Sequence, residues 1–557
     1  MDSRKKALEP WRYEVQAVVD CRFASSGWRS FLALAVILAG AETLAWRNRF
    51  IQDDAFISFR YARNLAEGRG LVWNVNEPIE GYTNFLWTVL MAVPHLLRID
   101  PITFAYCLGL ILYPITLGVT YGLAVLLLGS RLAGLLTVLL LGVNFTFSSY
   151  ATGGLETQLE TCLVTVLTYL VLAGHAHRAW SAGSLLAISL LSAAAIMTRP
   201  DGLLFVLVAH LTVLSSFRGN LFPHKLGMRL ASLLGPFGAL VGSWLIWKLR
   251  IYGCILPNAF YAKAMTAYVP FGIYYVCMFF LSYLLFPFVI LCPLLLWRKR
   301  IAWSFEIRIL LGIVLLWLGY VAIVGGDFME FRMIVPALPL IMVLVTMTLL
   351  GFTPHVRGRA ALGALVVAGS LLHVATFERS PIRRGITPIR LLYANVSEPE
   401  WNFVQVGKRL GEAFRHDPKV MIATTAAGAI PYYSGLSAVD ILGVNDSWIA
   451  RNGRMEGRGS GHRRRASLDY LIQRKVHLIL GQPARLAEVP KPSYSPRDLW
   501  NPVFRELVTE GALPSGARIL EIPINDAYKL VTLYLTSSPL VDEAIRRHGW
   551  RVVPIAL

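Results

Sequence analysis

Two adjacent carboxylates, Asp53 and Asp54, stand at the head of a segment whose residue types suit acid–base chemistry beside an anionic group. They open the stretch IQDDAFISFRYARNLAEGRGLVWNVNEPIEGYTNFLW, which runs from Ile51 to Trp87. Apolar residues then recur at helical spacing, with arginines between them. The spacing predicts an amphipathic helix at a membrane surface, where a base, cations and aromatic rings are held together. The alternative is a solvated loop between two membrane spans.

The acidic pair offers a general base. Asp53 is the expected base for an acceptor hydroxyl, because it is the carboxylate nearest the helix that emerges from the membrane. Asp54 is expected to orient one of the two reacting groups, or to exchange roles with Asp53. If both groups ionise close together, one pKa rises, which suits a base. The structural alternative is that the aspartates cap the following helix.

Four further polar motifs each stand at the end of a hydrophobic run. They are GGLET at 153–157, TRPDG at 198–202, LPNAFYAK at 256–263 and GGDFMEFR at 325–332. A channel would carry its charges in the middle of its spans, whereas loops that converge on one face are typical of a multispan enzyme. We therefore expect the acidic pair to share a water-facing chamber with Arg332.

Arginine suits the phosphate of a lipid-linked donor, because its guanidinium is always charged and forms two parallel hydrogen bonds. Arg332 is the first candidate for this role, followed by Arg199, Lys263 and Arg60. In the alternative interpretation, Arg199 and Arg60 anchor helix ends at lipid headgroups and Lys263 snorkels towards the surface.

The same motifs contain side chains that suit the hydroxyl groups of a polar ligand. Asp327 and Glu330 are two of them, although either could instead pair with Arg332. Glu156 follows two glycines that let the backbone approach a ligand closely, and its alternative role is to cap the next helix. Two further candidates, whose alternative is simply to begin a helix, are Asn258 and Tyr261.

Composition sets the class of protein. The chain has 557 residues, of which 55% are hydrophobic and 16% charged, and its mean hydropathy is +0.54. These values predict a polytopic membrane protein. The net charge of +19 is spread between hydrophobic runs and in the tail, without a continuous basic face. Anionic lipid and phosphate, rather than nucleic acid, are therefore the expected partners.

Cysteine and histidine patterns indicate no metal centre. Most of the six cysteines fall in apolar runs, and the last third of the chain has none, so neither a disulfide framework nor a thiolate site is predicted. The histidines lack the spacing of metal ligands. We predict no required cofactor, and a divalent cation on the acidic pair is the alternative that stays open.

Eleven hydrophobic runs are long enough to cross about 30 Å of hydrocarbon. They lie near 30–46, 103–128, 132–150, 157–173, 181–197, 202–217, 230–247, 270–296, 307–324, 333–351 and 360–377. Residues 82–97 contain Asn84 and Pro94, and we assign them to a re-entrant or surface helix rather than a span. This choice places the basic clusters between the spans on the cytoplasmic side. The expected topology has the N-terminus inside and the C-terminus outside.

The chain divides into two expected domains. Residues 1–377 form a transmembrane catalytic domain, with amphipathic outer-loop helices at 51–98. From 378 to 557 the apolar runs shorten to strand length and alternate with helical patterns, which predicts an extracytoplasmic α/β domain. This domain is expected to grip the acceptor through aromatic and acidic side chains, and the alternative is that the two tyrosines only pack. The candidates are Tyr432, Tyr433, Asp440 and Asp446.

The motifs, taken together, resemble a known family. The segments DDAFISFRYARNL, GLVWN, EGYTNFLW, GGLET, TRPDG, LPNAFYAK, GGDFMEFR and AGAIPYYSGLSAVDILGVND follow one another between about Asp53 and about Leu480. This series resembles the mycobacterial-type terminal arabinofuranosyltransferases, which belong to the GT-C class of multispan glycosyltransferases that use polyprenyl-phosphate sugars.

The resemblance implies a fold, an activity and a location. It implies a glycosyltransferase that moves arabinofuranose from decaprenyl-phosphoryl-arabinose to an acceptor hydroxyl outside the bacterial plasma membrane, in cell-wall or surface glycan assembly. The family's essential carboxylate in the first outer loop maps onto Asp53 and Asp54. Alternatives are a GT-C transferase of another polyprenyl-phosphate sugar that acts on a protein or lipid, and a transporter of lipid-linked sugars. A transporter would show internal repeats and charges at bilayer mid-depth, and the sequence has neither.

Overall fold

The chain folds into two compact units, each formed from separated stretches of sequence. The computed structural model describes residues 27–217, 223–263, 265, 268–298, 304–353, 355–399, 402–455, 463–480, 491–494 and 513–555. The first unit, here called the helical unit, comprises the chain up to Arg49, Ala105–Ile246 and Val269–Ile386. The second, here called the mixed unit, comprises Phe50–Phe104, Trp247–Tyr268 and Thr387–Leu557.

The helical unit is built from long apolar helices. In chain order they are α2 (Gly27–Arg47), α6 (Pro101–Leu128), α7 (Arg131–Gly142), α8 (Phe145–Ser149), α9 (Thr157–Ala176), α10 (Ala182–Thr198), η1 (Pro200–Gly202), α11 (Leu203–Ser215), α12 (Pro223–Tyr252), α14 (Val269–Ser282), α15 (Phe286–Trp297), α16 (Phe305–Ile323), η3 (Arg332–Ala337), α17 (Leu338–Phe352), α18 (Val356–Thr376), η4 (Phe377–Arg379) and η5 (Pro381–Arg383). The first residues of α6 and the last of α12 belong to the mixed unit.

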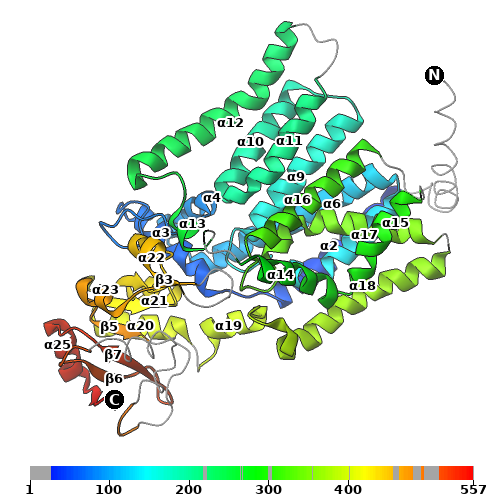
Figure 1. Ribbon diagram of the computed structural model, residues 1–557. Helices are drawn as coiled ribbons and strands as arrows, with labels where there is room; N and C mark the ends of the chain where they lie inside the picture. Colours follow the sequence, from blue (N-terminus) through cyan, green and yellow to red (C-terminus); the bar gives the residue numbers. More distant parts are fainter. Residues whose placement is uncertain are drawn as a thin grey trace, which may run out of the picture. The chain divides into compact units, whose positions relative to one another are not determined.

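Burial separates the centre of this unit from its periphery. Helix α17 is buried along nearly its whole length and packs against α7 and α15. Helices α9, α10 and α11 pack side by side, as Figure 1 shows. Helix α2 exposes bulky apolar side chains such as Trp28 and Phe31. Since large apolar surfaces are rarely left in water, the exposed faces of such helices are suited to lipid.

The polytopic helical class is confirmed, whereas the count of eleven spans is not. Among the described residues, seven helices are long and apolar enough to cross a membrane, or eight if the bent pair α14 and α15 is one span. Three expected spans are shorter helices in the structure: α7, α10, and η1 with α11. The run expected at 132–150 is interrupted because Asn144 caps a new short helix, α8. The direction in which the termini face stays a prediction.

The mixed unit combines short helices with a sheet. Its helices are α3 (Asp53–Ala66), α4 (Phe85–Leu90), α5 (Ala92–Leu97), α13 (Asn258–Ala262), α19 (Ile389–Ser397), α20 (Phe403–Ala413), α21 (Ala429–Ser434), α22 (Ser447–Asn452), α23 (Leu468–Gln473) and α25 (Pro539–His548). Its strands are β1 (Met421–Thr424), β2 (Ser437–Asp440), β3 (Arg454–Met455), β4 (Arg464–Arg465), β5 (Leu478–Leu480), β6 (Arg518–Pro523), β7 (Lys529–Tyr534) and β8 (Arg551–Val553). The expected C-terminal α/β fold is therefore confirmed.

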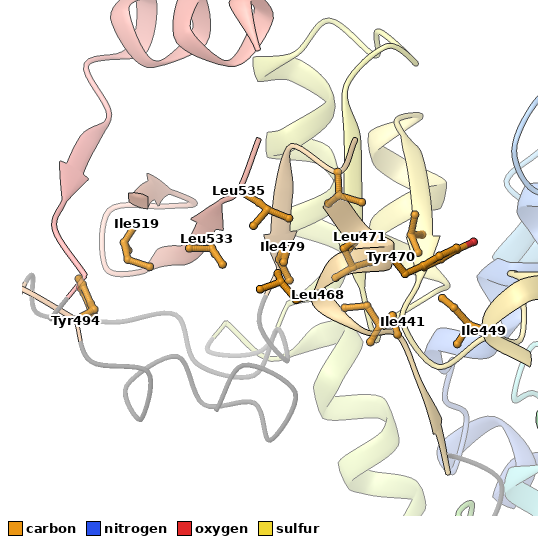
Figure 2. Packing of buried hydrophobic residues seen from close by; sticks show 14 of the residues in the cluster. Ile441, Ile449, Leu468, Tyr470, Leu471, Ile479, Tyr494, Ile519, Leu533 and Leu535 are labelled. Atoms are coloured by element: carbon orange, nitrogen blue, oxygen red, sulfur yellow. The ribbon is translucent and has the colours of Figure 1, made fainter. Parts of the chain in front are cut away.

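The sheet has six strands in the order β2-β1-β5-β7-β6-β8. Strand β1 pairs in parallel with β2 and β5, and the remaining pairs are antiparallel. A buried apolar cluster packs the sheet against α23 and the loops around it (Figure 2). Its labelled members include Ile441, Leu468, Leu471, Ile479 and Leu533.

The mixed unit also contains the polar segment from Ile51 to Trp87, which follows the first apolar run in the sequence. Helix α3 packs against α21, and most of its residues are buried. Its expected position at a membrane surface stays a prediction. The stretch 247–268 is tied to the same unit by a buried ion pair of 3.0 Å between Lys248 and Glu80. Residues 50–104 and 247–268 therefore belong to the same compact unit as the tail. The domain boundary expected at 378 stays a prediction.

Candidate active site

The carboxylate of Asp53 is held by backbone amides from a distant part of the chain. Its Oδ2 accepts a hydrogen bond of 3.1 Å from the amide of Gly428, and its Oδ1 accepts one of 2.7 Å from the amide of Ala429. Both amides lie at the start of α21. A Cβ atom at Gly428 would lie 1.8 Å from the carbonyl oxygen of Asp53, so only glycine allows this approach.

The surroundings of Asp53 raise the pKa of its carboxyl group. Burial raises the pKa of Asp53, the negative charges of Asp54 and Asp440 raise it further, and the two amide hydrogen bonds oppose them. The resulting pKa of Asp53 is about 7. A carboxylate with such a pKa is poised to take a proton near neutral pH.

Two acidic candidates for acceptor binding already accept hydrogen bonds from other residues of the mixed unit. Asp440 accepts hydrogen bonds from the amides of Leu442 and Asn445, at 3.0 and 2.9 Å, and burial raises its pKa to about 6. Asp446 caps α22 and accepts from the Tyr470 hydroxyl at 2.8 Å. Their contacts favour a role in shaping the loop after β2, and acceptor binding by either stays a prediction.

Tyr432 and Tyr433 pack against α3. The ring of Tyr432 lies 5.6 Å from that of Phe56, and the guanidinium of Arg63 lies 4.7 Å from its centre. The ring of Tyr433 lies 5.5 Å from that of Phe56. These contacts favour the packing alternative for both tyrosines, with α3 as their partner.

Arg60 is buried, and its guanidinium donates hydrogen bonds to other residues of the mixed unit. Its guanidinium donates to the carbonyls of Trp73 and Leu436, at 2.7 and 2.8 Å, and to Asn74 Oδ1 at 3.1 Å. Burial lowers its pKa to about 9. Because these acceptors occupy the guanidinium, the structure does not favour Arg60 as a ligand for the donor phosphate.

Asn258, in α13, contacts the loop that follows β2. Asn258 donates to the carbonyls of Gly443 and Val444, both at 2.9 Å. The guanidinium of Arg451 lies 4.0 Å from the ring centre of Tyr261, as a cation–π contact. Lys263 is the half-buried residue that ends α13. Asn258 therefore holds two segments together, and the sugar-binding roles of Asn258, Tyr261 and Lys263 stay predictions.

The helical unit gathers another set of candidates into one ionic network. Glu156 is fully buried, and its Oε1 accepts from Arg199 Nη1 at 2.9 Å and from Arg332 Nη2 at 2.5 Å. Arg199 also makes a two-pronged pair with Asp201, at 2.9 and 2.6 Å. Arg332 Nη1 lies 3.8 Å from Asp327 Oδ2. The last contact fits the pairing alternative for Asp327. The sequence did not indicate that Glu156 bridges the two arginines.

Glu330 belongs to a different pair. Its Oε1 lies 2.8 Å from Nε2 of His373, and both side chains are almost fully buried. Sequence reasoning missed His373, and the signal for it was a histidine within an apolar run, where polar residues are costly.

The two groups of candidates lie in different units. Asp53, Asp54, Arg60, Asn258, Tyr261 and Lys263 belong to the mixed unit, and Glu156, Arg199, Asp327, Glu330 and Arg332 to the helical unit. The chamber expected to join Asp53 to Arg332 stays a prediction. Across the described part of the chain, no three histidine, cysteine, aspartate or glutamate side chains gather as a metal site.

Comparisons with known proteins give one family match and one curated relative. The family described as "Domain of unknown function (DUF8728)" matches residues 393–539. The "Terminal beta-(1->2)-arabinofuranosyltransferase" of Mycobacterium tuberculosis (strain ATCC 25618 / H37Rv) is 27% identical over 257 residues. That match covers 42% of this chain and 38% of the relative, so the chain spans well under half of the curated protein that it matches.

Solved structures match over far more of the chain. ArnT from Cupriavidus metallidurans bound to undecaprenyl phosphate matches with a TM-score of 0.54 and 14% identity, over 93% of this chain and 99% of that one. The apo form of the same protein matches with a TM-score of 0.50 and 13% identity, over 92% and 100%. The resemblance to terminal arabinofuranosyltransferases is thus supported by a partial sequence match, and the chain has the fold of ArnT, the expected GT-C type of polytopic membrane protein.

Proposed function

We propose that this protein is an integral-membrane glycosyltransferase that moves arabinofuranose from a decaprenyl-phosphoryl-arabinose-type donor to a hydroxyl of a glycan or surface-protein acceptor. The reaction takes place on the extracytoplasmic face of a bacterial plasma membrane. The partial similarity to a terminal arabinofuranosyltransferase supports the sugar. The ArnT fold, solved in that protein with undecaprenyl phosphate, supports a polyprenyl-phosphate carrier.

The geometry of Asp53 is the observation that carries the proposal. A carboxylate held by two backbone amides, with a pKa of about 7, can accept the proton of an acceptor hydroxyl. The acceptor oxygen then forms a bond to the anomeric carbon, while the bond from that carbon to the phosphate oxygen breaks. The electron pair leaves with the polyprenyl phosphate and the proton goes to Asp53. Phosphate is a good leaving group, so this reaction needs no strong general acid.

Arg332 is the proposed ligand of the donor phosphate. It stands at the end of the motif at 325–332, and 13% of its side chain is exposed. Its ion pair with Glu156 holds the guanidinium in a fixed orientation. A cation that is already fixed beside the departing phosphate stabilises the negative charge that develops there, because it need not move during the reaction.

We expect Arg332→Ala to weaken the binding of decaprenyl phosphate by about 10- to 100-fold, the loss typical of a charged hydrogen-bonded contact. The measurement is equilibrium binding to the purified full chain in detergent. Arg308→Ala, which removes an exposed arginine of α16, is the matched control and should bind as the wild type does. Equal affinity of Arg332→Ala and wild type would remove the phosphate role.

Transfer should depend on pH through Asp53. Because its pKa is raised to about 7, the ionised fraction of the base falls about tenfold for each unit below pH 7, and kcat/KM should fall with it. Above that pH the rate should level off. Asp54→Asn removes a charge that helps to raise this pKa, so the acidic limb of its profile should move to lower pH. A profile that keeps its midpoint in Asp54→Asn would show that another group titrates.

The experiment that tests the function uses a panel of donors. Purified full-length protein is incubated with prenyl-phosphoryl arabinofuranose, mannose or an aminosugar, and release of prenyl phosphate is measured. Release from the arabinofuranose donor alone supports the proposal. Release from another donor alone supports the alternative GT-C activity, and release from none contradicts both.

A further inference from the structure

The bend between α14 and α15 is a fixed elbow in the helical unit. The two helices meet at 92°, and Leu284 at the break has a φ of 53°, a left-handed conformation that is rare for leucine. The hydroxyl of Tyr283 accepts from the Thr146 amide at 3.0 Å. A Cβ atom at Gly369 would lie 2.1 Å from the Tyr283 carbonyl oxygen, so α18 lies directly against the break.

His373 connects this elbow to the motif at 325–332. Its ring stacks on Tyr283, with 4.3 Å between the centroids, and on Phe377 at 4.6 Å. Its Nε2 lies 2.8 Å from Glu330 Oε1. The side chains of His373 and Glu330 are only 1% and 2% exposed, so the pair is sealed from solvent. A polar contact in such surroundings is strong, and breaking it leaves a buried carboxyl without this partner.

The residue between Glu330 and Arg332 is strained. Phe331 has φ 45° and ψ 19°, a left-handed conformation that costs a bulky residue about 1–2 kcal/mol. Its ring is enclosed by Phe279 and Phe377, at 5.4 and 5.3 Å. On one side of it Glu330 is anchored to His373, and on the other Arg332 is anchored to Glu156. Two anchors on either side of a strained residue hold the chain in one shape.

We infer that His373 is a positioning residue, which fixes Glu330 and through it the backbone that presents Arg332 to the phosphate of a lipid-linked donor. The inference rests on the proposed function, because that function supplies the phosphate that Arg332 would bind. The contacts of His373 with Tyr283 and with Glu330 do not depend on which sugar the donor carries. Loss of the imidazole contact should let Phe331 relax and Arg332 leave its orientation.

The test compares three substitutions at position 373 with one control. His373→Gln places an amide nitrogen where Nε2 lies and keeps a donor for Glu330. In His373→Asn the amide nitrogen lies nearer the position of Nδ1 and is too far from Glu330 for a hydrogen bond. His373→Leu removes the polar group altogether. Ser370→Ala is the control, because Ser370 is buried on the same helix and bonds Val143 and Phe145 rather than the motif at 325–332.

Two measurements on the purified full chain decide the matter. The dissociation constant for decaprenyl phosphate should rise about tenfold or more in the Asn and Leu variants, and stay within about threefold of wild type in Gln and Ser370→Ala. Hydrogen exchange of a peptide covering 325–335 should speed up in the same two variants only. Wild-type binding in the Leu variant, or equal losses in Leu and Ser370→Ala, would overturn the inference.

The exchange measurement separates this inference from the proposed function. If the wild-type chain binds no decaprenyl phosphate, the proposed function fails, and exchange alone decides the role of His373. Faster exchange confined to Asn and Leu then supports positioning, and unchanged exchange in both contradicts it.

Discussion

Asp53→Asn is expected to lower kcat for sugar transfer by about 10²- to 10⁴-fold, the contribution typical of a general base. The amide oxygen of asparagine can accept a hydrogen bond from one of the two amides that hold Asp53, but the group cannot take a proton. Donor binding should change little, because the proposed phosphate ligand is Arg332. The measurement is single-turnover transfer with saturating donor, together with the dissociation constant for decaprenyl phosphate.

Asn74→Ala provides the control for structural damage in this experiment. Asn74 is buried and joins the same two chain segments as Asp53 does, with hydrogen bonds of 2.8 and 3.2 Å to the backbone of Ala438. Its loss should cost about 1–3 kcal/mol of stability. If Asp53→Asn keeps near wild-type kcat, or loses no more than Asn74→Ala at equal stability, Asp53 is not the base.

Gly428→Ala should be the most damaging small substitution in the mixed unit. The added Cβ would lie 1.8 Å from the backbone oxygen of Asp53 and 2.9 Å from its Cγ. Backbone cannot rotate away as a flexible side chain can, so α21 must shift and both amide hydrogen bonds to Asp53 must break. We expect a loss of about 3 kcal/mol or more, from overpacking and from the lost charged hydrogen bonds.

Thermal unfolding and transfer assays of the full chain measure these losses. Gly516→Ala is the control, because its Cβ would meet no atom within 4 Å, and its stability should stay within about 0.5 kcal/mol of wild type. The carboxylate would also lose the amides that lower its pKa, so any residual activity should titrate at higher pH. A fully active and stable Gly428→Ala variant would contradict the described approach of α21 to Asp53.

The order of elements was largely readable from the sequence, because hydrophobic runs and strand-length patterns are local signals. Helix α3, expected from apolar spacing after Asp53, begins at that residue. Breaks within apolar runs were harder to foresee. Asn144 ends the run expected at 132–150 by capping α8. A single polar residue in an apolar run is not enough to predict that the helix breaks there.

The partners of charged side chains could not be read in the same way. Arg60 seemed suited to phosphate because it is an arginine. In the structure it donates a hydrogen bond to the carbonyl of Leu436, which is 376 residues away in the sequence. Glu330 and Arg332 are two residues apart in the sequence, yet they are anchored to His373 and Glu156. Local spacing can suggest which residues are capable of chemistry, but the fold decides which of them are already satisfied by the protein.

The 375 residues that separate Asp53 from the amide of Gly428 also bear on biogenesis. In the described part of the chain, every candidate span except the first lies between these two positions. The ribosome therefore releases the aspartate early and its amide cradle late, after the rest of the bundle has been made. In a nascent or truncated product that stops short of residue 428, Asp53 would lack the two amide hydrogen bonds that Gly428 and Ala429 donate to it.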